Sequence, residues 1–173
     1  MLTYKSTKML TQMTTFDRLL QSKNLIRVTR QLPRGQFHER RFYAYPDCLE
    51  WMKSEVPQLT TGRAQSAFTP LEQLMERLRQ WMAGDAMRYG PWFHDMTPKS
   101  DHVWELKTDD LRIFGWMYQP CAFIAVRGGQ ADDYKEPTKI KNYADERREV
   151  IKARDTLPLD GKKFAEGEFD DLV

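Results

Sequence analysis

The sequence contains few residues of the types that hold metals or form disulfide bonds. Only three His and two Cys occur among its 173 residues, and the His residues, at positions 38, 94 and 102, belong to no HxxxH, HExxH or Cys/His motif. Cys48 and Cys121 form no CxxC motif and lie in apolar segments, which indicates reduced, buried thiols rather than a structural disulfide. We therefore expect no metal centre.

Motifs of nucleotide-binding proteins and of nucleophilic hydrolases are also missing. The one glycine-rich segment, Arg127-Gly128-Gly129-Gln130, lacks the GxGxxG or GxxxxGK[ST] spacing that cradles phosphates, so we expect a turn there. No GxSxG elbow occurs, and neither Cys has a nearby His to activate it. Any activity should therefore proceed without a cofactor.

Long apolar runs are absent too. No run approaches the roughly 18 residues that a bilayer-spanning helix needs, and the N-terminus lacks an apolar stretch followed by a small-residue cleavage site. Apolar residues make up 40% and aromatic residues 12% of the chain, which is enough for a folded core. We expect a folded cytoplasmic protein without membrane contact.

Charge is small in sum but unevenly distributed. The net charge is +2, yet residues 1–45 carry nine Lys and Arg against two acidic residues, and the chain ends in the acidic segment FAEGEFDDLV. The basic third is suited to nucleic acid, whose phosphates release counterions on binding. It is equally suited to the acidic tail of its own chain or of another copy, which would give a homo-oligomer.

The N-terminal third predicts short elements. Residues 1–15 lack periodicity, and residues 16–25 are compatible with a short helix. Residues 26–45 alternate in the manner of a β-hairpin, with Pro33, Arg34 and Gly35 as its turn. Asp47 is expected to cap a helix that ends before Pro57.

A second helix has the strongest local signals. Thr69, Pro70 and Glu72 form a capping box with proline at the first helical position, and an apolar stripe follows as far as Gly84. Residues 85–101 are expected to form an irregular connection. Its aromatic segment, Trp92 to His94, should pack against the sheet as a loop and border a site.

The C-terminal half predicts three antiparallel strands and a helix. The strands are His102–Lys107, Asp110–Tyr118 and Cys121–Arg127, joined by turns too short for any other pairing. The third strand is apolar on both faces and should be central. A helix is expected from about Lys139 to Thr156, followed by a partly mobile tail. The expected fold class is α+β, with a small antiparallel sheet packed against helices.

Basic residues accompany this sheet. Lys107, Arg112 and Arg127 lie on its strands, with Lys135, Lys139 and Tyr143 on the following loop and helix. Such groups can bind a phosphate, stabilise charge and transfer protons in metal-free RNA cleavage. The alternative is that they are solvated charges or ion-pair partners of Glu105, Asp109 and Asp110.

The segment Pro70–Leu157 resembles the RelE/HigB-like toxin superfamily, in its phage-derived host-killing branch. The similarity lies in the WELK strand (Trp104–Lys107), the DLRIF strand (Asp110–Phe114), the order of elements and an AxxRRExxKxR helix. The resemblance implies a RelE-like domain over residues 70–157, preceded by a basic extension (1–69) and followed by the acidic tail (158–173).

The resemblance further implies a metal-free endoribonuclease that acts on mRNA, in association with the ribosome, and that has an antitoxin protein as partner. It implies that Arg112 holds the scissile phosphate, Lys107 and Arg127 add positive charge, and Lys135 or Tyr143 transfers a proton. Lys139 and the hairpin residues Arg27 and Arg30 are further candidates for RNA or phosphate binding. The alternative function is a non-catalytic module that uses the same sheet to bind a protein or a nucleic acid.

Overall fold

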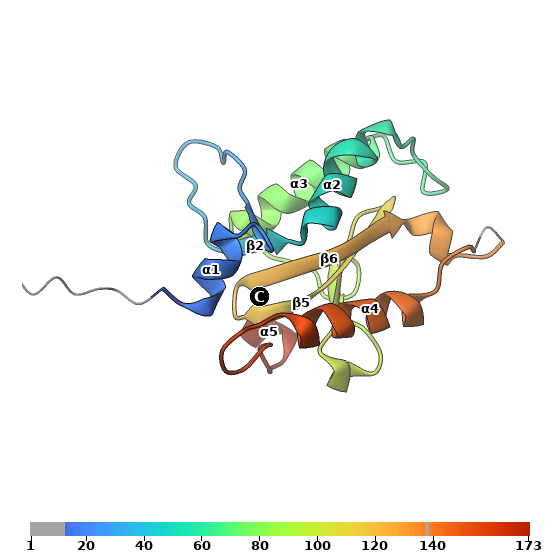
Figure 1. Ribbon diagram of the computed structural model, residues 1–173. Coiled ribbons are helices and arrows are strands. Elements are labelled where there is room, and N and C mark those ends of the chain that lie inside the picture. Colours follow the sequence, from blue (N-terminus) through green and yellow to red (C-terminus); the bar gives the residue numbers. More distant parts are fainter. Residues whose placement is uncertain (1–12, 138) are drawn as a thin grey trace, which may run out of the picture.

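The computed structural model describes residues 13–137 and 139–173 as a mixed α/β fold. Its centre is a six-stranded sheet with the order β1-β2-β6-β5-β4-β3, in which every neighbouring pair is antiparallel except β2 and β6. Figure 1 shows α2 and α3 on one side of β5 and β6 and α4 on the other. The unpatterned N-terminal segment lies largely outside the described residues.

The three strands expected in the C-terminal half are present. They are β4 (Trp104–Lys107), β5 (Leu111–Gln119) and β6 (Ala122–Gln130), and β6 lies between β2 and β5. The third strand is thus central, as predicted.

Strand β6 continues through Gly128 and Gly129, where the sequence suggested a turn. A Cβ atom on Gly128 would lie 2.1 Å from the Trp51 ring, so the glycine lets this indole pack against the strand. These glycines therefore serve side-chain packing and do not end the strand.

The N-terminal hairpin belongs to the same sheet. β1 (Ile26–Val28) pairs with β2 (Arg41–Ala44), and β2 runs parallel to β6, with Phe42 opposite Phe123. Both of these phenylalanines are buried, which attaches the hairpin to the centre of the sheet. The parallel pair makes the sheet mixed rather than wholly antiparallel.

A strand occupies part of the connection that was expected to be irregular. β3 (Phe93–Asp95) pairs antiparallel with β4 and forms the edge of the sheet. Phe93 is fully buried and stacks on Trp104 with ring centroids 5.0 Å apart. Burial of this ring explains why three residues without a clear strand pattern join the sheet, and the prediction of a loop was wrong here.

Helices cover one face of the sheet over a core that includes Trp81 and Phe123. This face carries α2 (Pro46–Ser54), the short η1 (Val56–Gln58), α3 (Pro70–Met82) and α5 (Phe169–Leu172). The Thr69–Glu72 capping box of α3 is confirmed. In contrast, α2 begins at Pro46 and has no side-chain cap, so Asp47 lies within its first turn instead of preceding it.

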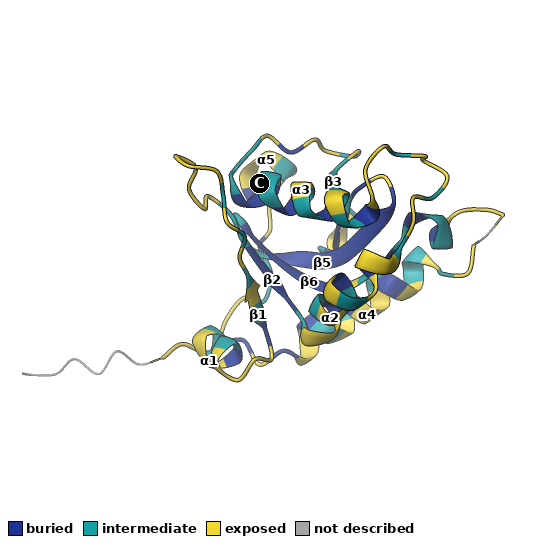
Figure 2. Ribbon diagram, turned by 90° about the horizontal axis from the view of Figure 1, so that it is seen from above, coloured by how far each residue is buried: buried dark blue, intermediate teal, exposed yellow. Residues whose placement is uncertain are grey.

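The other face packs on α1 (Thr15–Gln21) and α4 (Tyr143–Thr156), over a core that includes Trp116 and Val150. Figure 2 shows the buried strands between helices whose outer sides are exposed. α4 begins later than expected because the Asn142 side chain caps it, accepting from the amide of Ala144. Two 3₁₀ turns, η2 (Lys99–Asp101) and η3 (Ala131–Tyr134), complete the elements.

The C-terminal tail is packed against the sheet. The amide of Ala165 donates to the Met117 carbonyl at 2.8 Å, and Leu172 is almost fully buried. In the part of the chain that the structure describes, no helix has the length and apolar character needed to cross a bilayer.

Candidate functional site

Four ionisable side chains converge on one face of the sheet at strands β3, β4 and β5. Alternation along β4 points Glu105 and Lys107 to the same face. The strand register then sets His94 of β3 opposite Glu105 and Arg112 of β5 opposite Lys107. We call these four residues the Glu105 cluster.

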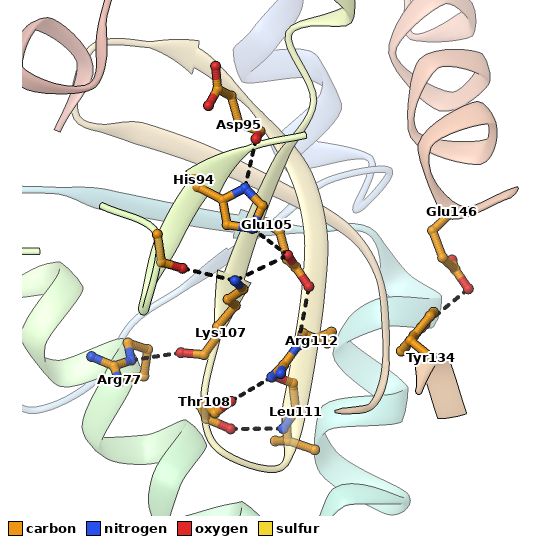
Figure 3. A network of polar contacts seen from close by, with 11 residues as sticks. Arg77, His94, Asp95, Glu105, Lys107, Thr108, Leu111, Arg112, Tyr134 and Glu146 are labelled. Atoms are coloured by element: carbon orange, nitrogen blue, oxygen red, sulfur yellow. Dashed lines mark hydrogen bonds and ion pairs between the residues drawn. The ribbon is translucent and has the colours of Figure 1, made fainter. Parts of the chain in front are cut away.

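The carboxylate of Glu105 is the common partner of the cluster. Its Oε2 lies 2.8 Å from His94 Nε2 and 3.9 Å from Lys107 Nζ, and its Oε1 lies 3.3 Å from Arg112 Nε (Figure 3). The Glu105 side chain is only 2% exposed. One buried carboxylate therefore faces three basic side chains.

The His94 ring faces a hydrogen-bond acceptor at each nitrogen. Nε2 meets the Glu105 carboxylate, and Nδ1 lies 2.7 Å from the main-chain carbonyl oxygen of Asp95. A neutral imidazole can donate from only one nitrogen, whereas the imidazolium donates from both. The hydrogen bond to Glu105 accordingly raises the pKa of His94, against an opposing effect of burial. The site thus favours a protonated His94.

The pKa of Lys107 is shifted in the opposite direction. Burial lowers its pKa, and the positive charges of Arg112 and Lys135 lower it further, while Glu105 acts against them. Its ammonium group donates to the carbonyl oxygen of Gly90 at 2.9 Å. Lys107 therefore releases a proton more easily than an exposed lysine does.

Arg112 is held from two sides. Its Nη1 donates to the main-chain oxygens of Thr108 and Leu111 at 2.6 and 2.7 Å, and its side chain is 9% exposed. These contacts fix the β4–β5 turn beside Glu105. Arg112 consequently supplies charge from beneath the surface and supports the conformation of the site.

Tyr143, the first residue of α4, completes the site from the helix side. Its hydroxyl lies beside Glu105 and Arg112, and burial together with the negative charge of Glu105 raises its pKa. The ring packs on Tyr134 at 4.9 Å between centroids. Tyr143 is thus held as a neutral phenol that can donate a hydrogen bond.

The cluster opens on a cavity of about 460 Å³ between β3, β4 and the start of α4. Its lining includes His94, Glu105, Lys107, Tyr143 and Arg147. The His94 and Lys107 side chains are 24% and 22% exposed, in contrast to the buried Glu105. Within the Glu105 cluster, His94 and Lys107 are therefore more open to a ligand in this cavity than Glu105 is.

The structure brings together some of the residues singled out from the sequence. Lys107, Arg112 and Tyr143 meet at the cluster, and the charge of Lys135 acts on Lys107. Arg127 instead pairs with Glu146 at 2.7 Å, in a separate group with Tyr134. Figure 3 shows Tyr134 and Glu146 apart from the Glu105 cluster.

The remaining basic candidates lie elsewhere. Lys139 is exposed on the loop that leads to α4. Arg27 lies on β1, at the edge of the sheet opposite to β3, and Arg30 follows that strand and contacts Met75 of α3. These three residues do not contact the Glu105 cluster.

Sequence reasoning assigned no role to His94 and treated Glu105 only as an ion-pair partner. The usable signal for Glu105 was its i, i+2 spacing to Lys107 in a strand, which places both on one face. His94 had only a weak signal, its place in an aromatic segment expected to border a site. Its partner is 11 positions away on another strand, and only pairing of β3 with β4 brings the two together.

Among residues 13–137 and 139–173, no group of three or more His, Cys, Asp or Glu residues is arranged to hold a metal ion. Cys48 is buried and both cysteines are free thiols. Comparison of the chain with protein-family models, with curated proteins and with solved structures finds no match.

Proposed function

We propose that this protein is a metal-free endoribonuclease of the RelE/HigB-like toxin type, acting on mRNA in association with the ribosome. The observation that carries the proposal is that the His94 imidazole, whose pKa is raised, shares the buried carboxylate of Glu105 with Lys107 at an open cavity. A proton donor next to a lysine of lowered pKa supplies both halves of general acid–base catalysis. The resemblance of the WELK and DLRIF strands adds to this argument.

The charge of the cluster suits a phosphodiester. His94, Lys107 and Arg112 surround a single carboxylate, so the site retains net positive charge when all four groups are ionised. A phosphodiester carries one negative charge, and the pentavalent intermediate of its cleavage carries more. Positive charges fixed in a partly buried site stabilise that increase more than they stabilise the bound substrate.

Proton transfers can be assigned from exposure and pKa. Lys107 in its deprotonated form accepts the proton of the RNA 2′-hydroxyl, and the 2′-oxygen attacks the phosphorus atom. The bond from phosphorus to the 5′-oxygen then breaks, and His94 gives its proton to that oxygen. The products are a 2′,3′-cyclic phosphate and a 5′-hydroxyl, without consumption of any other reactant.

The remaining residues of the site support Lys107 and His94 in these proton transfers. Glu105 is too deeply buried to reach the RNA first, and it positions His94 and raises the pKa of that ring. Tyr143 offers a hydrogen bond to a phosphate oxygen, and Lys135 adds positive charge near Lys107. Arg112 acts through the conformation of the β4–β5 turn and through its charge.

A cleavage assay tests the proposal. Purified protein is incubated with mRNA in EDTA, with and without ribosomes, and the fragment ends are analysed for a 2′,3′-cyclic phosphate. His94→Gln and Lys107→Met should each lower the rate about 100-fold or more, as expected for loss of a general acid or base. Arg27→Ala, at the opposite edge of the sheet, is the matched control and should cleave normally.

Two further measurements complete this test. A 2′-deoxy nucleotide at the cut position should block cleavage, because it removes the attacking group. Expression of the wild-type chain should arrest growth, whereas the His94→Gln chain should not. Absence of cleavage with and without ribosomes, together with harmless expression, would rule out the enzyme.

The second candidate is a non-catalytic module that binds a protein or nucleic acid through this sheet. It is favoured by the burial of Glu105 and Arg112 and by the main-chain bonds of the Arg112 guanidinium, features typical of a structural ion cluster. In that case a partner recovered with the wild-type chain should be recovered equally with His94→Gln. Loss of the partner with rising salt would indicate nucleic acid, and nuclease treatment of the recovered partner would identify it.

A further inference from the structure

A second cavity lies on the other side of the β4–β5 turn from the Glu105 cluster. It has a volume of about 550 Å³ and lies between α3, the segment before α3 and the turn residues Thr108 and Asp109. Lys107 lines the first cavity and its neighbour Thr108 lines the second. Figure 3 shows the Lys107 ammonium directed toward Glu105 and its main-chain carbonyl directed toward Arg77, which lines the second cavity. The two cavities thus lie on opposite faces of the sheet, the first beside α4 and the second beside α3, with the β4–β5 turn between them.

An exposed aromatic ring borders this second cavity. The Phe68 side chain is 63% exposed. Its main chain is nevertheless anchored, because the Gln73 side chain donates to the Phe68 carbonyl at 2.8 Å and to Asp110 at 2.7 Å. Gly62 in the same segment also bonds to Asp110, at 2.9 Å. An exposed ring on an anchored backbone is a ready stacking surface, and aromatic rings stack on every nucleobase.

The charges of the cavity select against a phosphate. Three carboxylates, those of Glu72, Glu76 and Asp109, line it together with the single cation Arg77. Glu72 is committed to the capping box of α3 and Glu76 to an ion pair with Arg79. Asp109 is exposed and accepts no hydrogen bond from a side chain within the described part of the chain. A neutral group that donates hydrogen bonds fits such a site better than an anion does.

We propose that the cavity between Phe68 and Asp109 binds a nucleobase of single-stranded RNA that passes around the β4–β5 turn from the phosphate held at the Glu105 cluster. The base stacks on Phe68 and donates from an exocyclic amino group to the Asp109 carboxylate, the contact that acidic side chains make with cytosine. This inference rests on the proposed RNA substrate. It adds a determinant of sequence preference at one position beside the cut.

The test uses the full chain and two uncharged probes that differ in the relevant group, cytidine and uridine. Binding is followed by protein NMR shifts during titration. Cytidine should bind more tightly than uridine, because uracil presents a carbonyl where cytosine presents an amino group. Phe68→Ala should weaken both probes about 10-fold, the size expected for loss of one stacking contact. Asp109→Asn should remove the preference for cytidine, because its amide can also donate.

Phe37→Ala is the matched control, since Phe37 is also an exposed ring, at 76%, in the loop between β1 and β2. It should leave both affinities unchanged. No binding of either nucleoside, equal weakening by Phe37→Ala, or a cytidine preference that survives Asp109→Asn would each overturn the base site.

The base site and the cleavage proposal can fail separately. His94→Gln should bind cytidine normally while it cleaves no RNA. If the wild-type chain cleaves RNA and Phe68→Ala cuts at the same sites, the base site is refuted. The nuclease proposal is then still supported. Phe68-dependent cytidine binding by a wild-type chain that cuts no RNA would refute the nuclease alone.

Discussion

His94 Nε2 lies 2.8 Å from Glu105 Oε2, across the pair formed by the edge strand β3 and its neighbour β4. The other nitrogen of the same ring meets the main-chain oxygen of Asp95. Two acceptors around one imidazole make the charge state of His94 depend on Glu105. Replacement of either residue should therefore change the pKa of His94 or the pH dependence of folding stability.

Replacement of Glu105 by Gln should lower the pKa of His94. The hydrogen bond to the Glu105 carboxylate, and the negative charge of that group, raise this pKa and are lost, while burial, which lowers it, remains. The measurement is an NMR titration of the His94 ring protons in the two proteins. Asp109→Asn is the control, because it removes an exposed carboxylate that does not contact His94, and it should leave the midpoint of the His94 titration unchanged. An unchanged His94 midpoint in Glu105→Gln would contradict the assigned pairing.

The His94–Glu105 pair should also make stability depend on pH. The pKa of His94 is raised on folding above its ordinary value of 6.5, so the stabilisation is complete below about pH 6.5. It is lost as the pH rises through the pKa of the folded state. We expect the difference in unfolding free energy between wild type and His94→Gln to shrink with rising pH. Denaturant unfolding of both proteins between pH 5 and about pH 9 checks this.

Arg112→Ala should destabilise the fold rather than remove only a ligand contact. The change leaves the Glu105 carboxylate facing fewer cations and frees the Thr108 and Leu111 carbonyls, which costs about 3 kcal/mol. Arg148→Ala is the control, because this side chain and its partner Asp145 are both exposed, at 71% and 58%, and its loss should cost about 1 kcal/mol or less. Equal unfolding free energies of the two variants would show that Arg112 is not structural.

Gly128→Ala should be destabilising through the Trp51 ring. A Cβ at this position would lie 2.1 Å from Trp51 Cζ3, so the indole must move, at a cost of about 1–3 kcal/mol. In a Trp51→Leu background the indole is absent, so Gly128→Ala should lower the unfolding free energy by less than it does in the wild-type chain. A double-mutant cycle of unfolding free energies measures the coupling. Additive effects would argue against the contact.

Several features of this fold could be predicted because their causes are local. The capping box at Thr69, the strand alternation around Trp104 and the short β4–β5 and β5–β6 turns each depend on neighbouring residues. The helix start at Asp47 and the strand end at Gly128 were predicted wrongly for a related reason. Tyr45, which precedes α2, donates its amide to the Ala125 carbonyl of β6, and the Trp51 ring packs on Gly128, and the local pattern contains neither contact.

The site itself was only half predictable. The residue order in WELK determines that Glu105 and Lys107 share one face of a strand, and β4–β5 pairing adds Arg112 opposite Lys107. Arg127 lies on a predicted strand as well, but its side chain reaches Glu146 of α4, and the position of that helix depends on the whole core. A common strand does not imply a common site.

The sequence alone determined the types of charge available and the face of the strand from which Glu105 and Lys107 project, because alternation and short turns act over a few residues. Only the tertiary structure decided that His94 meets Glu105. That contact depends on burial of Phe93 against Trp104, which draws β3 into the sheet and fixes its register. Burial of surfaces from distant segments is a property of the whole chain, and it completed the cluster that short-range patterns had begun.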